Sequence, residues 1–144
     1  MGANSEKASA AAEEQPMTKL RSDITRHGIS RTPHRAFMRA MGLDDEAIAK
    51  PMIGVVSMKG EQTPCNMTHG FQVEAAKLGV AKAGGTPREF ATISISDGIG
   101  MNHEGMKFSL VSRELIADSI EAVVHGLAYD GLVRSAAATR LCPG

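Results

Sequence analysis

Three short apolar segments, separated by segments with helical spacing, constrain the fold of this 144-residue chain more than any other feature. The first, residues 52–58, is a continuous apolar run behind a proline, which is typical of a buried strand. Residues 90–96 form the second predicted strand, and a third begins at Asp130. The order strand, helix, strand, helix, strand predicts a parallel sheet with right-handed crossovers, and so an α/β fold.

The segments between these strands carry apolar residues at intervals of three and four positions, which is the spacing of a helix. In residues 66–82 these positions are Met67, Phe71, Ala75, Leu78 and Ala81. The same spacing continues from Leu110 to Leu127, and Ser109 or Ser112 is the expected N-cap. A helix before the first strand is predicted to begin at Thr32 and Pro33 and to end at Gly42.

Composition fits a folded domain and points to no charged macromolecular partner. Hydrophobic residues make up 42% of the chain, and sixteen basic residues balance sixteen acidic ones. With no tryptophan and one tyrosine, the chain lacks stacking platforms, so we expect no nucleic-acid partner. No apolar run approaches the ~18–20 residues of a membrane span, so we expect no membrane partner. Residues 1–19 carry acids and no apolar stretch, so we predict a disordered tail and a cytoplasmic protein.

Two loops follow predicted strands, at the edge of a parallel sheet where ligands collect. Cys65 lies just before a helix, whose N–H groups and positive dipole end would stabilise a thiolate. It can equally be a small buried apolar residue. Asp97 opens a glycine-rich loop over 97–106 and can face the same crevice, or it can be a turn residue that bonds its own backbone. Local sequence leaves both alternatives open for both residues.

Other polar and sulfur-containing residues receive structural interpretations. His103 and Glu104 lack a metal-ligand spacing, so we expect them in a solvated loop. Glycines 98, 100 and 105 miss the spacing of the dinucleotide fingerprint. The remaining histidines are expected in surface or capping roles; they are His27, His34, His69 and His125. Met101 and Met106, which lie beside the loop, are expected to pack in the core.

Several motifs, in this order and spacing, resemble the dihydroxy-acid dehydratase family, which also contains sugar-acid dehydratases. They are Thr63-Pro64-Cys65-Asn66, Ala-Gly-Gly-Thr-Pro-Arg-Glu-Phe at 83–90, Thr-Ile-Ser-Ile-Ser-Asp-Gly-Ile at 92–99, His-Glu-Gly-Met at 103–106 and Ser-Leu-Val-Ser-Arg-Glu-Leu-Ile-Ala-Asp-Ser at 109–119. The resemblance runs over residues 20–133, which we interpret as part of the N-terminal α/β domain of such an enzyme.

The resemblance implies a lyase that dehydrates 2,3-dihydroxy acids to 2-keto acids in branched-chain amino-acid biosynthesis. It implies an iron–sulfur cluster, for which Cys65 matches the first ligand, and a Mg²⁺ ion, for which Asp97 matches a ligand. It also implies a small-molecule dihydroxy acid substrate and a homodimer for the full-length enzyme. The base of the family is a serine in a later domain, so the catalytic residue is unknown in this chain. A sugar-acid dehydratase fragment and a non-catalytic α/β fragment are the alternatives.

The family pattern breaks after Val133. The expected positions of the second cluster cysteine and of the Mg²⁺-site lysine hold Ala138 and Arg140, and Cys142 does not stand at a matching position. One permitted codon choice for residues 134–144 encodes Val-Gly-Gly-Cys-Asp-Lys in another reading frame. We therefore interpret residues 134–144 as a divergent tail produced by a frameshift, and we expect the chain to be incomplete as an enzyme.

Overall fold

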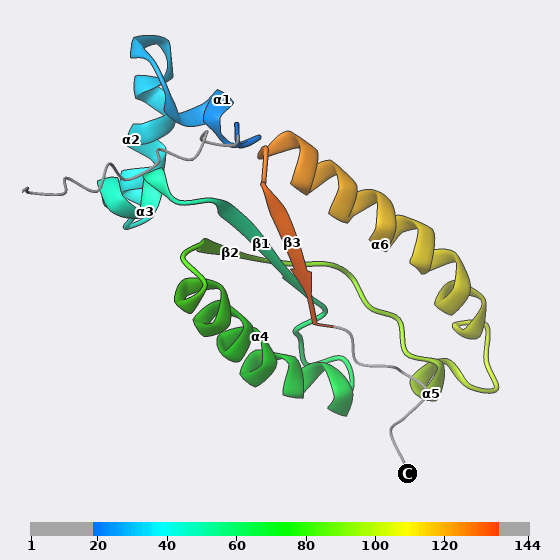
Figure 1. Cartoon of the computed structure of the whole chain (residues 1–144). Helices are drawn as coiled ribbons and strands as arrows, with labels where there is room; N and C mark the ends of the chain where they lie inside the picture. The colour runs from blue at the N-terminus through cyan, green and yellow to red at the C-terminus, as the bar shows by residue number, and fades with distance from the viewer. Residues whose placement is uncertain (1–18, 136–144) are drawn as a thin grey trace, which may run out of the picture.

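The computed structural model describes residues 19–135 and contains a three-stranded parallel sheet with helices around it (Figure 1). The strands are β1 (Met52–Ser57), β2 (Thr86–Ala91) and β3 (Gly131–Arg134), and their order in the sheet is β2-β1-β3. The predicted α/β class is therefore confirmed. The predicted tail over 1–19 lies outside the described residues except for its last residue, and so does the C-terminal tail beyond residue 135.

The helices form a cluster at the start of β1, and two long helices and one short helix follow along the chain (Figure 1). The cluster contains α1 (Asp23–Arg26), the 3-10 helix η1 (Ile29–Arg31), α2 (Thr32–Ala40) and α3 (Asp45–Ala49), and the rest are α4 (Pro64–Lys82), α5 (Asp97–Gly100) and α6 (Met106–Gly126). Within residues 19–135, no helix has the length and apolarity to cross a membrane.

The core lies between the central strand and α4. Val55 of β1 packs with Val73 and Val80 of α4, and Ile53 and Ala76 pack against them. Five of the six residues of β1 are buried, as its continuous apolar run predicts. The position of β1 between two other strands explains this burial.

The apolar positions that predict α4 lie on its outer side. Met67, Phe71 and Leu78 are exposed, whereas Val73 and His69 are buried. Apolar residues occur on more than one side of this helix, so the spacing predicts a helix without selecting the face that packs on the sheet. The predicted surface role of His69 is wrong; burial lowers its pKa, and its Nδ1 lies 3.1 Å from Ser135 Oγ.

Strand β2 begins and ends earlier than predicted, at Thr86 and Ala91 rather than over 90–96. Pro87, the second residue of β2, lacks an N–H group. It is accommodated because β2 is an edge strand, whose outward side needs no ladder partner. Residues 92–96 lie beyond the strand, although Thr92 N–H still donates a hydrogen bond to the carbonyl of Ser57 at the end of β1 (2.9 Å).

Helix α6 begins at Met106, so the prediction of Ser109 or Ser112 as its N-cap is wrong. Both serines are buried within the helix. The exposed side chains of Met101 and Met106 also contradict their predicted core positions within the described chain. The exposed positions of His27, His34 and His125 agree with the surface roles predicted for them.

One half-buried carboxylate joins the N-terminal helices to the sheet. Asp130 accepts hydrogen bonds from Ser22 N–H (2.9 Å), Ser22 Oγ–H (2.6 Å) and Met52 N–H (2.7 Å). Burial raises the pKa of Asp130, but the hydrogen bonds from Ser22 and Met52 outweigh it and hold the pKa below its ordinary value. The carboxylate thus joins three distant chain segments.

Candidate functional site

The two loops singled out from the sequence meet at the carboxyl edge of the sheet (Figure 1). The loop after β1 leads into α4, and the segment after β2 leads into α5. A cavity of about 200 Å³ lies between them, lined by Gln62 and Thr63 of the first and by residues 94–96 of the second. The structure therefore brings together the segments that carry Cys65 and Asp97.

Cys65 is the second residue of α4 and is half-buried, so it lies inside the first turn rather than before the helix. Thr63 is the N-cap, and its hydroxyl accepts a hydrogen bond from Asn66 N–H at 3.3 Å. The buried Asn66 side chain donates to the carbonyl of Met58, just past β1. These bonds fix the start of the 19-residue helix that carries Cys65 in its first turn.

Asp97 is the first residue of α5 and is half-buried. Its Oδ1 accepts a hydrogen bond from Ser109 Oγ of α6. The N-cap role belongs to Ser96, whose hydroxyl accepts from Gly98 N–H at 3.3 Å. Asp97 therefore contacts a neighbouring helix, and neither Asp97 nor Cys65 is among the residues that line the cavity between the two loops.

The contact of Ser109 with Asp97 was not predicted from the sequence. Ser109 is buried, and its carbonyl accepts a hydrogen bond from Ser112 Oγ at 3.1 Å. A second cavity, of about 110 Å³, is bordered by both serines and by Ser94 and Ile95. Two serines three residues apart in the predicted helix were the available signal, because such a pair lies on one face.

His103 lines the larger cavity but uses both ring nitrogens inside its own loop. Nδ1 accepts a hydrogen bond from Gly105 N–H at 3.0 Å, and Nε2 lies 2.8 Å from the carbonyl of Ile99. These partners assign the ring proton to Nε2. Glu104 is exposed and pairs with Lys107. Both residues are exposed, as expected for a solvated loop, and their side chains contact nearby residues of the chain.

The donor types of this site suit the groups that the resemblance implies, but their number is too small. A cysteine thiolate suits an iron–sulfur cluster, and an aspartate carboxylate suits Mg²⁺. Among residues 19–135, no three histidine, cysteine, aspartate or glutamate side chains gather where they could hold a metal ion. The described residues can thus supply single ligands to such groups, and a complete site needs ligands from elsewhere.

A parallel α/β sheet with a cavity at its carboxyl edge is the arrangement in which α/β domains commonly bind ligands. The family described as "Dihydroxy-acid/6-phosphogluconate dehydratase N-terminal" matches residues 50–144, and the chain belongs to this family. It is 75% identical over 128 residues to dihydroxy-acid dehydratase 3 of Bradyrhizobium diazoefficiens, covering 89% of this chain and 22% of the relative. It is 57% identical over 125 residues to dihydroxy-acid dehydratase 2 of Bordetella bronchiseptica, covering 87% and 22%. It is 53% identical over 125 residues to the dihydroxy-acid dehydratase of Pyrococcus abyssi, covering 87% and 23%. The chain thus spans less than a quarter of the length of these curated relatives.

Proposed function

We propose that the chain is the N-terminal part of a dihydroxy-acid dehydratase, which converts 2,3-dihydroxy acids to 2-keto acids in branched-chain amino-acid biosynthesis. The observation that carries this proposal is the 75% identity to a dehydratase of that name, over 128 residues. The longer enzyme is proposed to act as a cytoplasmic homodimer on a small-molecule substrate. Because the matched residues form 22% of that relative, the remaining polypeptide must contribute to the activity.

Within this proposal, Cys65 contributes one ligand to an iron–sulfur cluster and Asp97 contributes one ligand to Mg²⁺. When bound, these groups would supply Lewis acidity to the substrate. The Thr63 cap fixes the start of α4, and the positive end of the helix dipole there would favour Cys65 as a thiolate ligand. Ser109 donates to one oxygen of Asp97 and so orients the carboxylate, whose other oxygen remains available to a cation.

A sugar-acid dehydratase fragment is the alternative that the family description itself keeps open, because it also includes 6-phosphogluconate dehydratases. The relatives described above are all named dihydroxy-acid dehydratases, which favours the dihydroxy-acid substrate. A non-catalytic fragment is the other alternative. It predicts that no chemistry depends on Cys65 or Asp97.

The proposal is tested with a chimeric enzyme that joins residues 1–133 of this chain to the following part of the Bradyrhizobium dehydratase. The anaerobically purified chimera is assayed with a branched 2,3-dihydroxy acid and with a sugar acid. We expect turnover of the branched acid, and a loss of at least 100-fold in Asp97→Asn. Ser119→Ala is the control, because this exposed hydroxyl bonds only to its own helix at Ile116, and it should retain full activity. Preferred turnover of the sugar acid, or an active Asp97→Asn chimera, would contradict the proposal.

A further inference from the structure

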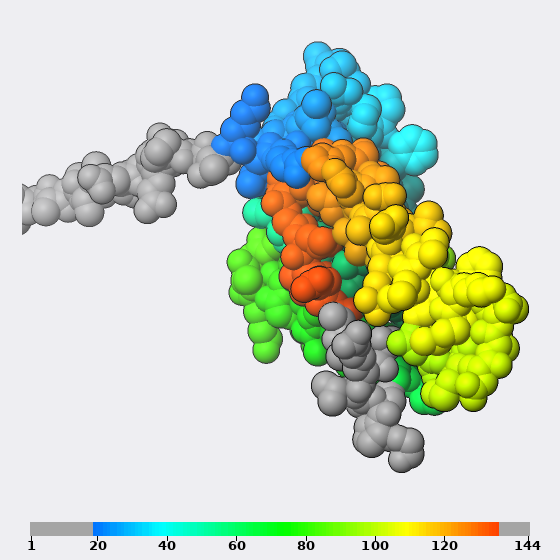
Figure 2. Space-filling view, turned by 90° about the vertical axis from the view of Figure 1, so that its right-hand side faces the viewer, coloured from blue at the N-terminus to red at the C-terminus, as the bar shows by residue number. Residues whose placement is uncertain are grey.

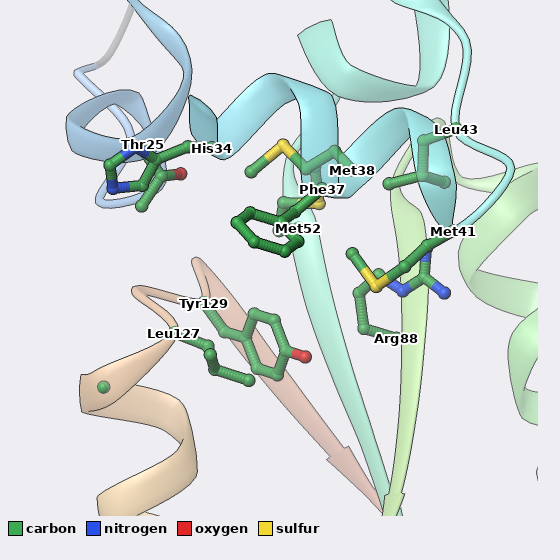
Figure 3. Close-up of a pocket in the computed structure, with 11 residues that line it drawn as sticks. Thr25, His34, Phe37, Met38, Met41, Leu43, Met52, Arg88, Leu127 and Tyr129 are labelled. Carbon is green, nitrogen blue, oxygen red and sulfur yellow. The ribbon is translucent and has the colours of Figure 1, made fainter. Parts of the chain in front are cut away.

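An apolar cavity of about 330 Å³ opens between α2, the sheet and the turn from α6 to β3, away from the cavity at the carboxyl edge (Figure 3). Phe37, Met38 and Met41 of α2 line one side, and Leu127 and Tyr129 lie opposite them. Arg88 of β2 lies at the border below Met41. We call the space bounded by these six residues the α2 socket.

Three of the apolar side chains of the α2 socket are largely exposed to water. Phe37 is 74% exposed, Met41 58% and Leu127 55%. Contiguous exposed apolar surface of this kind marks an interaction site in a soluble protein, because its burial is favourable by about 25 cal/mol per Å². The socket is therefore suited to receive an apolar side chain.

Arg88 gives the α2 socket a positive charge with no counterpart. Among residues 19–135, its guanidinium forms no hydrogen bond or ion pair, whereas the adjacent Glu89 pairs with Lys59 and Lys77. His34 is the other ionisable basic residue of the lining, which contains no aspartate or glutamate. A half-buried guanidinium is a bidentate donor that fits a carboxylate, so the charge of the socket selects an acidic partner.

We propose that the α2 socket docks a segment of the dehydratase polypeptide that lies beyond this chain. That segment inserts an apolar side chain between Phe37 and Tyr129 and places a carboxylate on Arg88. The relatives indicate the occupant, because the matched residues make up 22% of the Bradyrhizobium enzyme and most of that polypeptide lies outside the part matched by this chain. The inference rests on the proposed function, from which it takes the identity of the partner.

The test co-expresses the 144-residue chain with a separate polypeptide, the part of the Bradyrhizobium dehydratase that follows the matched residues. The dissociation constant of the purified pair is then measured for each variant. Arg88→Gln and Phe37→Ala should each weaken binding at least tenfold, and Arg88→Lys should weaken it less than Arg88→Gln. Lys82→Gln is the charge-matched control at the exposed end of α4, and it should change binding less than twofold. Circular dichroism spectra matching that of the parent chain establish that the variants are folded.

A second measurement uses the chimeric enzyme and does not require the chain to be soluble alone. In the chimera, the cysteine of Met41→Cys should react with a maleimide at least tenfold more slowly than the cysteine of Ala83→Cys. Peptide mapping identifies the labelled cysteine in each variant. Equal labelling, absence of a complex, or unchanged binding in Arg88→Gln and Phe37→Ala would overturn the proposal. A homodimer of this chain that Phe37→Ala dissolves would overturn it too, because a second copy would then fill the socket. If Arg88→Gln and Phe37→Ala weaken binding but the chimera has no dehydratase activity, the proposed function is refuted while the docking role of the α2 socket is supported.

Discussion

The hydrogen bond between Ser22 and Asp130 allows a quantitative test of how the N-terminal helices are held. Ser22→Ala removes the 2.6 Å bond from the hydroxyl to the carboxylate but leaves the bonds from the two N–H groups of Ser22 and Met52. A hydrogen bond to a charged acceptor contributes about 1.5–3 kcal/mol. Because Ser22 is 1% exposed, water cannot replace its hydroxyl, and we expect a loss of about 2 kcal/mol in the free energy of unfolding.

Urea unfolding followed by circular dichroism measures this loss. With a slope of about 2 kcal/mol per molar urea, the midpoint of Ser22→Ala should fall by about 1 M at pH 6. Since the pKa of Asp130 is lowered in the folded state, its stabilisation is complete above the ordinary value of 3.8 and disappears as the pH falls through the folded pKa. The difference between Ser22→Ala and the parent chain should therefore shrink in acid.

Two results would refute this reasoning. One is a change below 0.5 kcal/mol at pH 6, and the other is a difference that stays constant from pH 6 to pH 2. Ser119→Ala provides the matched control, because it removes an exposed serine hydroxyl that bonds to its own helix. It should leave the midpoint unchanged at both pH values.

The remaining predictions concern packing, association and the tail. Gly54→Ala should destabilise the chain by about 1–3 kcal/mol in the same unfolding assay, because the new Cβ would lie 2.9 Å from Tyr129 Cδ2; an unchanged midpoint would disprove this close packing. The isolated chain should self-associate at micromolar concentration because exposed apolar residues cover the outer sides of α4 and α6, and light scattering from a stable monomer would contradict this. Sequencing the coding DNA from codon 133 should reveal Cys-Asp-Lys in another reading frame, and confirmation of the given frame with no dehydratase sequence downstream would refute the frameshift interpretation.

The sequence predicted the central strand well because five of the six residues of β1 are buried. A strand in that position must be continuously apolar, and residues 52–58 carry that signal with little interference. The edge strand β2 begins four residues earlier than predicted. Its outward side tolerates Pro87, a residue that would break a strand in the centre of a sheet. The ends of an edge strand depend on its pairing with one neighbouring strand and on the lack of a strand on its other side. The local sequence does not contain that information.

The helices show a second limit of sequence reasoning. The apolar stripe with Phe71 and Leu78 predicted α4 correctly, yet it points away from the core of the described residues. Phe108 and Leu110 of α6 are exposed in the same way. In Figure 2, the residues around α5 and the start of α6, coloured yellow-green to yellow, project from one side of the molecule. The helices therefore carry more apolar surface than this sheet can cover, which accords with a domain that packs inside a longer enzyme.

For the candidate site, the positions of Cys65 and Asp97 after two parallel strands were enough to predict that their loops meet. The contact between Asp97 and Ser109 was not predictable, because it joins two helices through a turn whose geometry the sequence does not specify. Local propensity instead favoured Ser109 as an N-cap. In the structure Ser109 lies inside α6, is buried, and donates a hydrogen bond to the Asp97 carboxylate instead of capping the helix.

The iron content of the anaerobically purified chimera tests the central claim most directly. The chimera should contain an iron–sulfur cluster, and Cys65→Ser should lose most of its iron while it keeps the circular dichroism spectrum of a folded protein. Asp97→Asn should keep its iron, because its carboxylate is assigned to Mg²⁺. A Cys65→Ser chimera with the full iron content of the parent would contradict the assignment of Cys65 as a cluster ligand.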